Sequence, residues 1–170
     1  MLVSLIFMLA NGPVFSTDVN YSGAYYCRPS DSAGMLYNSQ LKTQSKWTAT
    51  HYMDRPDDAY IVKLSDTGEV TEDEVMGVTL EARVVTISVK VVGSDHPAES
   101  CRNSTIPSSI ERMKMFGETI RCSDSARDYL FNFKNRRFQT YYEGQFVNPN
   151  AEESRSKSPQ LSIGSCEKIE

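Results

Sequence analysis

The chain has 170 residues, of which 18 are Lys or Arg and 22 are Asp or Glu, so its formal net charge is 18 − 22 = −4 with both histidines neutral. This length predicts one domain. Hydrophobic residues make up 39% and charged residues 24%, a balance that excludes a disordered or collagen-like chain and predicts a packed core. The sequence has no run of 18 apolar residues, which excludes a multi-pass helical membrane protein. An acidic chain also lacks the overall basic field that supports non-specific nucleic-acid binding.

Residues 1–16 carry no charged side chain and are mostly apolar. This pattern is typical of a secretory signal peptide, although the usual basic start is missing. The stretch is too short to span a bilayer, and Val14 and Ser16 are small residues at the two positions that signal peptidase reads. We therefore expect cleavage after Ser16, which leaves a single secreted domain over residues 17–170. The alternative is a buried N-terminal strand or helix.

The first half of the expected mature chain shows one helical pattern and one strand pattern. A weak helix is predicted over Asp31–Lys46, capped by Asp31 or Ser32. A strand is predicted at Tyr60–Leu64, and turn chemistry follows at Asp66-Thr67-Gly68. The acidic run after this turn does not have the spacing of an EF-hand loop, so a solvated hairpin tip is expected there rather than a calcium site. The run consists of Glu69, Glu72, Asp73 and Glu74.

The clearest element comes next, at Val84–Val92, where apolar residues alternate with more polar ones as in a strand with one dry face. A helix is predicted over Ser108–Ile120, because Ser108 and Glu111 have capping-box spacing and apolar residues then recur at helical intervals. The polar tract Asn148–Pro159 predicts a loop. The remaining predicted strands are Tyr129–Phe133, Phe138–Tyr142 and Leu161–Ile163, and Lys134-Asn135 forms a turn between the first two.

All four cysteines follow the expected cleavage site, and an even number of them predicts two disulfides in an oxidising compartment. They are Cys27, Cys101, Cys122 and Cys166. Three pairings are possible. A bridge from Cys27 to Cys166 would close the longest loop and so give the largest chain-entropy stabilisation, and Cys101 would then pair with Cys122. No two cysteines have Cys-x-x-Cys spacing and no histidine lies near them, so a zinc site is not expected.

Strands outnumber helices and do not alternate regularly with them, which predicts an α+β fold with an antiparallel sheet. The end motifs narrow this prediction. Tyr25-Tyr26-Cys27 is a Tyr-x-Cys at the expected mature N-terminus, and Cys166 stands four residues before the end of the chain. This arrangement resembles the small secreted effector candidates of powdery mildew fungi, many of which are similar to fungal guanyl-specific ribonucleases. Asp128–Asn132 followed by Lys134–Phe138 is similar to a strand, polar turn and strand of that ribonuclease family.

The resemblance covers both ends of the chain and one hairpin. It implies a ribonuclease-like, disulfide-linked fold in which a helix packs on a twisted antiparallel sheet and a disulfide joins the two ends. Asp95 to Ser123, which carries two further cysteines, would be an insertion into this fold or a sign of a different one.

The resemblance also allows a test for catalysis. Cleavage of RNA through a cyclic phosphate needs a base, an acid and cations that face the phosphate. Tyr129 stands where the resembled family has an arginine, and Phe138–Glu143, where its late histidine would fall, contains no histidine. The only histidines are His51 and His96, and neither lies in a context that carries the family role over. We therefore expect no catalytic residue and no enzyme activity.

A small cluster of cations and aromatic residues could contact RNA or a protein partner, although an ordinary hairpin turn with charged tips is the favoured explanation. The cluster consists of Lys134, Arg136, Arg137, Tyr141 and Tyr142. No phosphate-binding glycine loop, nucleophile elbow or zinc-protease motif is present, so neither a cofactor nor a metal is expected. Trp47, the single tryptophan, is expected in the core.

The sequence thus predicts a secreted fungal effector that binds host plant proteins, an immune receptor among them, through an inactive ribonuclease-like scaffold and so modulates host immunity. RNA is the weaker partner, entry into host cells is left open, and no membrane contact is expected after signal cleavage. The loops Asp95–Pro107 and Asn148–Pro159 are the expected contact surfaces. Two alternatives remain. An active secreted ribonuclease would cleave RNA in a manner that depends on His51, and a lipocalin-like secreted ligand carrier would contain a central apolar cavity.

Overall fold

The structure is a computed structural model that describes residues 19–37, 47–52, 59–95, 98–102, 112–124, 127–143 and 158–170. These residues form ten β-strands and no helix. The expected signal peptide, residues 1–16, lies outside them. The strands are β1 (Gly23–Tyr37), β2 (Trp47–Tyr52), β3 (Tyr60–Val75), β4 (Val78–Val91), β5 (Glu99–Ser100), β6 (Arg112–Phe116), β7 (Thr119–Ser123), β8 (Arg127–Asn132), β9 (Arg137–Tyr142) and β10 (Gln160–Lys168).

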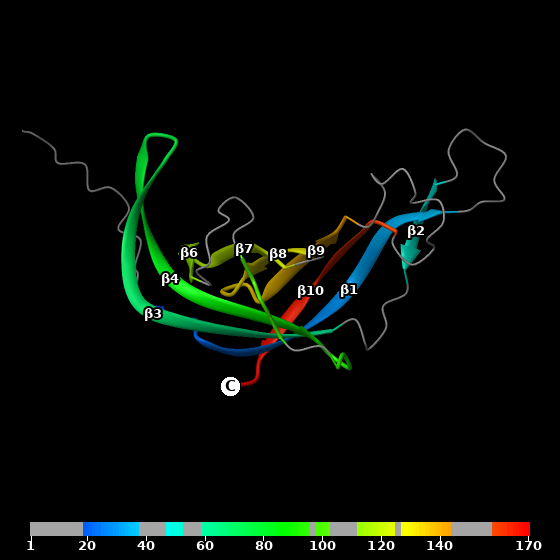
Figure 1. The fold of residues 1–170 in the computed structure, drawn as a ribbon, viewed down its shortest axis with the longest axis horizontal. Coiled ribbons are helices and arrows are strands. Elements are labelled where there is room, and N and C mark those ends of the chain that lie inside the picture. The colour runs from blue at the N-terminus through cyan, green and yellow to red at the C-terminus, as the bar shows by residue number, and fades with distance from the viewer. Residues whose placement is uncertain are drawn as a thin grey trace, which may run out of the picture.

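Antiparallel pairing joins eight of the described strands into a closed ring. The order around the ring is β10-β9-β8-β7-β6-β4-β3-β1, and β1 pairs back onto β10. In Figure 1, β10 accordingly lies between β9 and β1. The short strand β5 pairs with β4, and β2 pairs with the second half of β1. The first and last described strands are therefore neighbours, although they are far apart in the chain.

Alternation along each strand divides the side chains into an inner and an outer set, because successive residues point to opposite faces. The inner set is rich in aromatic rings, and Phe131 lies at its centre. Its ring centroid is 5.8 Å from those of Tyr129 and Phe133 and 6.2 Å from that of Phe138. Tyr25 and Tyr60 complete the aromatic group. Side chains thus fill the interior of the ring, and aromatic stacking adds to the stability gained by burial.

Each disulfide lies at a place where the ring closes. Cys27 and Cys166 are directly opposite each other in the pairing of β1 with β10. The second place is between β6 and β7, whose pairing is limited to Phe116 and Thr119. Residues 99–102 strengthen this region: they pair with β4, and Arg102 exchanges two backbone hydrogen bonds of 2.8 Å with Ser123 of β7. The second disulfide, Cys101–Cys122, joins the same two segments. The predicted pair of disulfides is therefore confirmed, with the pairing that closes the longest loop.

The prediction of an α+β fold with a helix on a sheet is wrong, because the described residues are all-β. Arg112–Phe116 and Thr119–Ser123, within or beside the predicted helix Ser108–Ile120, form the β6–β7 hairpin. Met113 and Met115 are both buried there, which a strand allows and one face of a helix does not. The same apolar residues fit both periods when the run is short, and pairing with β4 decides in favour of the strand.

The other predicted helix, Asp31–Lys46, is also wrong over the residues that the structure describes. Asp31–Tyr37 is the second half of β1, which pairs with β10 on one side and with β2 on the other. Residues 38–46 lie outside the described part of the chain. Hydrogen bonds from two neighbouring strands outweigh the weak helical propensity of this segment.

Most predicted strands are confirmed. Val84–Val91 lies in β4, Tyr60–Leu64 begins β3, and the three short predicted strands fall in β8, β9 and β10. The turn predicted at Asp66-Thr67-Gly68 is wrong: β3 continues through it, and the register shift between Asp66 and Val70 marks a bulge. The hairpin turns ten residues later, at Met76-Gly77, where both residues have positive φ. No helix in the described residues is long and apolar enough to cross a membrane.

Gly164 is needed where β10 passes β1. A Cβ atom at this position would collide with the Arg28 carbonyl oxygen and would lie 2.5 Å from the Phe138 ring and 2.8 Å from the Pro29 Cα atom. We expect Gly164→Ala to lower the free energy of unfolding by about 1 to 3 kcal/mol, because the added methyl group overpacks a region that includes backbone. Chemical denaturation measures this. Ser165→Ala, at an exposed position of the same strand, is the control and should change stability by about 0.5 kcal/mol or less.

Candidate functional site

The outer face of β8, β9 and β10 carries apolar side chains that face solvent. Leu130, Tyr141, Leu161 and Ile163 are between 39% and 48% exposed. Strand register brings them together: Leu161 is opposite Tyr141, and Ile163 and Leu130 are both opposite Gln139 of β9. We call these four residues the outer patch. Groups of exposed apolar side chains like this one often mark a binding site.

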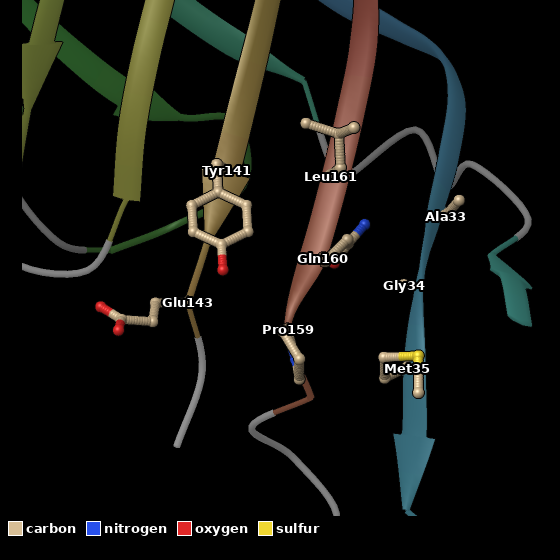
Figure 2. Close-up of a pocket in the computed structure, with 8 residues that line it drawn as sticks. All are labelled: Ala33, Gly34, Met35, Tyr141, Glu143, Pro159, Gln160 and Leu161. Atoms are coloured by element: carbon tan, nitrogen blue, oxygen red, sulfur yellow. The ribbon is translucent and has the colours of Figure 1, made fainter. Parts of the chain in front are cut away.

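Two surface hollows flank the outer patch. The larger has a volume of about 640 Å³ and the smaller about 330 Å³. Figure 2 shows the smaller hollow crossing three strands, with Tyr141 on β9, Leu161 on β10 and Ala33 on β1 side by side. The larger hollow is lined by Ser30, Thr119, Leu130, Asn132, Arg137, Phe138, Gln139, Ile163, Gly164 and Ser165. Each hollow therefore includes members of the outer patch in its wall.

The larger hollow carries positive charge. Arg137 lines it, Arg121 of β7 is directly opposite Leu130, and Arg28 of β1 is directly opposite Ser165. All three arginines are exposed, and none forms an ion pair with another described residue. No acidic side chain lines this hollow within the described residues. It therefore combines apolar walls with the Arg137 guanidinium, and Arg28 and Arg121 stand beside two of its lining residues.

The five residues predicted to contact RNA or a partner do not form one surface. Lys134 forms an exposed ion pair with Glu118 at 2.9 Å, which lowers the pKa of the Glu118 carboxyl. Arg136 occupies the β8–β9 turn, where its carbonyl oxygen accepts the Cys166 N–H at 2.8 Å. Arg137 and Tyr141 lie on the outer face. Tyr142 lies on the opposite face, with its ring centroid 5.5 Å from the Arg127 guanidinium. Of the five, only Tyr141, a member of the outer patch, and Arg137 share the outer face.

One end of the ring interior is polar instead of aromatic. Ser32, Ser162 and Thr140 are buried and lie in one row across β1, β10 and β9. Ser32 Oγ donates to Ser162 Oγ at 2.9 Å, so these hydroxyls satisfy each other. Tyr129, the next residue in the row, donates its hydroxyl to Asp124 Oδ2 at 2.5 Å. Burial raises the pKa of Tyr129, with a further rise from Asp124, so its phenol stays protonated. This row holds the fold together and contains no activated group.

The histidines give no reaction centre within the described residues. His51 lies on β2 with its side chain 82% exposed, and its Nδ1 is 3.6 Å from Asp31 Oδ1. His96 lies outside the described residues. Tyr129, at the position compared with a catalytic arginine, is buried in the core. Across the described ranges, no group of three or more His, Cys, Asp or Glu side chains is placed to hold a metal ion.

Two other predictions concern regions that the structure describes only in part. Of the loops expected to contact a partner, only Asp95, residues 98–102, Ser158 and Pro159 are described. Pro159 lines the smaller hollow. Trp47, expected in the core, is half-buried on β2. The sequence analysis placed the contact surfaces on loops, so it missed the outer patch, which lies on strands.

A part-buried ion pair joins β3 and β4. Arg83 Nη1 donates to Asp66 Oδ2 at 2.7 Å, and the Gly68 N–H donates to Asp66 Oδ1 at 2.8 Å. The Asp66 side chain is only 9% exposed. The hydrogen bond from Gly68 lowers the pKa of the Asp66 carboxyl, and Arg83 lowers it further, against the effect of burial. The folded state therefore favours the ionised form of Asp66.

This pKa shift predicts a pH dependence of stability. Because the folded-state pKa lies below the unfolded value of about 3.9, the stabilisation is complete above pH 4 to 5 and is lost as the pH falls through the folded-state pKa. Asp66→Asn should lower the free energy of unfolding by about 1 to 3 kcal/mol near neutral pH. Denaturation curves at a series of pH values should show the difference between the two proteins shrinking as the pH falls below the unfolded value and vanishing only below the folded-state pKa of Asp66. A difference in unfolding free energy that stays constant down to about pH 2.5 would contradict the lowered pKa of Asp66.

The described geometry thus offers a binding surface with an apolar centre and a basic hollow beside it, held on a disulfide-linked sheet. A scan against protein-family models, a search of curated proteins and a search of solved structures find no match to this chain.

Proposed function

We propose that this protein is a secreted, non-enzymatic binding module that acts on a protein of a host plant, and that the outer patch is its contact surface. The observation that carries the proposal is the exposure of Leu130, Tyr141, Leu161 and Ile163 side by side on three hydrogen-bonded strands. A partner that covers these side chains removes their remaining apolar surface from water. Because the four side chains are between 39% and 48% exposed, each gains less than half of the roughly 1.5 to 3 kcal/mol that burial of a fully exposed side chain gives.

The scaffold supports this role because it holds the patch rigid. β10 is hydrogen-bonded on both sides, and Cys166 attaches it covalently to β1. A preorganised surface loses little conformational entropy on binding. Two disulfides and no free cysteine among the described residues also agree with an oxidising compartment. The resemblance of the chain ends to powdery mildew effector candidates supports a host plant protein as the partner.

The alternative functions have less support. An RNA-binding surface would need the basic and aromatic residues to converge, and Tyr141 and Tyr142 lie on opposite faces of β9. A ribonuclease would need an acid and a base in one cleft, and His51 is exposed on β2 beside Asp31. A ligand carrier would need an open interior, and aromatic rings occupy the interior of this ring.

A pair of matched variants tests the proposal. The protein is immobilised and incubated with leaf extract of a host plant, and retained proteins are identified by mass spectrometry. Leu161→Glu with Ile163→Glu should lose the specific partner, because charged side chains in the contact cannot be desolvated cheaply. Ile169→Glu, at another exposed apolar position of the chain, should retain it.

The partner so identified is then purified, and its affinity is measured by calorimetry. We expect the double substitution to weaken binding at least about tenfold, a loss of about 1.4 kcal/mol of binding free energy. Equal affinity of the double variant and the wild type would contradict the role of the outer patch. The same preparations incubated with total RNA check for cleavage, and degradation that depends on His51 would favour the ribonuclease alternative.

A further inference from the structure

The β3–β4 hairpin continues beyond the ring as a free two-stranded arm. The pairing of β4 with β6 ends at Ala82, whereas β3 and β4 remain paired to the last residues before their turn. Figure 1 shows the turn of this hairpin standing apart from the other strands. We call residues 69–81 the arm.

The arm concentrates the negative charge of the protein. It contains five acidic residues and no basic one, a charge of −5, so the rest of the chain has a charge of −4 − (−5) = +1. Two of the five are paired with β6: Glu69 with Arg112, and Asp73 with Lys114 at 2.8 Å. Glu72, Glu74 and Glu81 are exposed and have no ion-pair partner among the described residues.

Two of these unpaired carboxylates oppose each other. Glu72 and Glu81 are directly opposite in the β3–β4 register. Like charges at such positions destabilise a hairpin. The isolated chain gains nothing from this placement, whereas a basic partner would neutralise both groups at once.

The end of the arm is apolar. Met76 at the turn is 98% exposed, and Val78 beside it is 57% exposed. Met76 and Gly77 form the turn with φ of 53° and 78°, values that favour Asn or Gly at both positions. The arm therefore presents an apolar end beside unneutralised carboxylates.

The larger hollow has the complementary composition. Leu130 and Ile163 supply apolar walls, and Arg137 lines the hollow with positive charge. Arg28 and Arg121 stand opposite the lining residues Ser165 and Leu130, and none of the three arginines has an ion-pair partner among the described residues. None of the residues that line it belongs to the arm. An occupant of this hollow should therefore be an acidic segment with an apolar end, and the chain itself contains one.

We propose that the arm of one copy docks in the larger hollow of a second copy of this chain. The inference goes beyond the proposed function, because it names a second copy of this chain as an occupant of part of the outer patch, Leu130 and Ile163. Carboxylates of the arm would face the three arginines, while Met76 and Val78 would cover Leu130 and Ile163. Each copy has one arm and one hollow, so the contacts join copies head to tail in a closed ring or a chain, or reciprocally in a dimer.

Light scattering coupled to size-exclusion chromatography tests the proposal on the purified protein with both disulfides formed. The wild type should show a mass above that of one chain, and the mass should rise with protein concentration. Raising NaCl from about 50 to about 500 mM should weaken the association, because exposed charges are then screened. Wild-type protein that stays at the mass of one chain at all concentrations would overturn the inference.

Variants of the arm separate association from folding. Met76→Asn should raise the melting temperature, because Asn adopts a positive φ at lower cost, yet it should weaken association because the apolar end is lost. Glu72→Lys with Glu74→Lys should weaken association at least about tenfold while removing the repulsion with Glu81. Unchanged association in both variants would contradict a contact through the arm.

A charge change in the hollow supplies the rescue. Arg137→Glu reduces the charge of the three arginines from +3 to +1, and Glu72→Lys/Glu74→Lys reduces the charge of the arm from −5 to −1, so each variant alone should associate more weakly than the wild type. Mixing the two variants should restore association, because the unchanged arm of the Arg137→Glu protein then meets the unchanged hollow of the arm variant. No recovery in the mixture would count against the direct contact.

Failure of this inference and failure of the proposed function are distinguishable. A monomeric wild type whose Leu161→Glu/Ile163→Glu variant loses a host protein keeps the proposed function and rejects self-association. Self-association that follows the charge rules, with no host protein lost on that double substitution, keeps the inference and rejects the host partner.

Discussion

Replacing Cys27 and Cys166 together by Ala is expected to lower the free energy of unfolding by about 5 kcal/mol. The disulfide joins residues separated by 139 positions, so it removes a large part of the conformational entropy of the unfolded chain. It also lies where the ring closes between β1 and β10. Urea denaturation of the double variant and the wild type, monitored by circular dichroism, measures the difference.

The Cys101→Ala/Cys122→Ala protein is the matched comparison. Its disulfide spans 21 positions, so the expected loss is about 3 kcal/mol. Reduction of both disulfides should add the two effects if the closures act independently. A smaller loss for the Cys27–Cys166 pair than for the Cys101–Cys122 pair would show that loop length does not govern their contributions.

Phe131→Ala is expected to lower the free energy of unfolding by about 3 to 5 kcal/mol. Phe131 is 1% exposed, and its ring stacks with Tyr129, Phe133 and Phe138. Truncation to Ala removes these contacts and leaves a cavity that rings on three sides cannot fill. Thermal and chemical denaturation both measure the loss.

Leu130→Ala is the control, one residue away on the opposite face of β8 and 39% exposed. Its effect on stability should be about 0.5 kcal/mol or less. It should nevertheless weaken binding through the outer patch, of which Leu130 is a member. Equal destabilisation by both substitutions would mean that the assignment of inner and outer faces on β8 is wrong.

The outer patch was missed because strands were predicted without their faces. Leu161 and Ile163 alternate with Ser162, and apolar residues are expected to face a core. The structure shows the reverse in β10: Ser162 is only 4% exposed, whereas Ile163 is 48% exposed. The reason is the disulfide. Cys166 points inward to reach Cys27, so every second residue before it, including Ser162, must also point inward.

Alternation of inward and outward side chains, counted back from Cys166, could therefore have identified the part of the patch that lies on β10. The same argument applies to β9, where inward Phe138 requires outward Tyr141. It needs one fact that composition does not supply, namely that the strand runs unbroken from Gln160 to Lys168. The sequence predicted only Leu161–Ile163 as a strand, too short to connect to the cysteine.

The prediction of a helix at Ser108–Ile120 failed for a related reason. Residues 112–116 form a strand whose inner side chains, Met113 and Met115, are buried against the aromatic core. Methionine has no strong preference for strands, so neither residue signalled one locally. Pairing with β4 supplied the hydrogen bonds, and β4 is about 30 residues earlier in the chain.

The amino-acid sequence by itself determined the features that depend on neighbours in the chain: alternation in β3, β4, β8 and β9, the β8–β9 turn, and four cysteines placed to form two bridges. Only the tertiary structure decided the closure of the ring, the face that each strand turns outward and the free arm at 69–81. Backbone hydrogen-bonding groups are nearly the same in every residue, so they do not select the partner of a strand. The shared core and the covalent links between distant residues decide which strands pair.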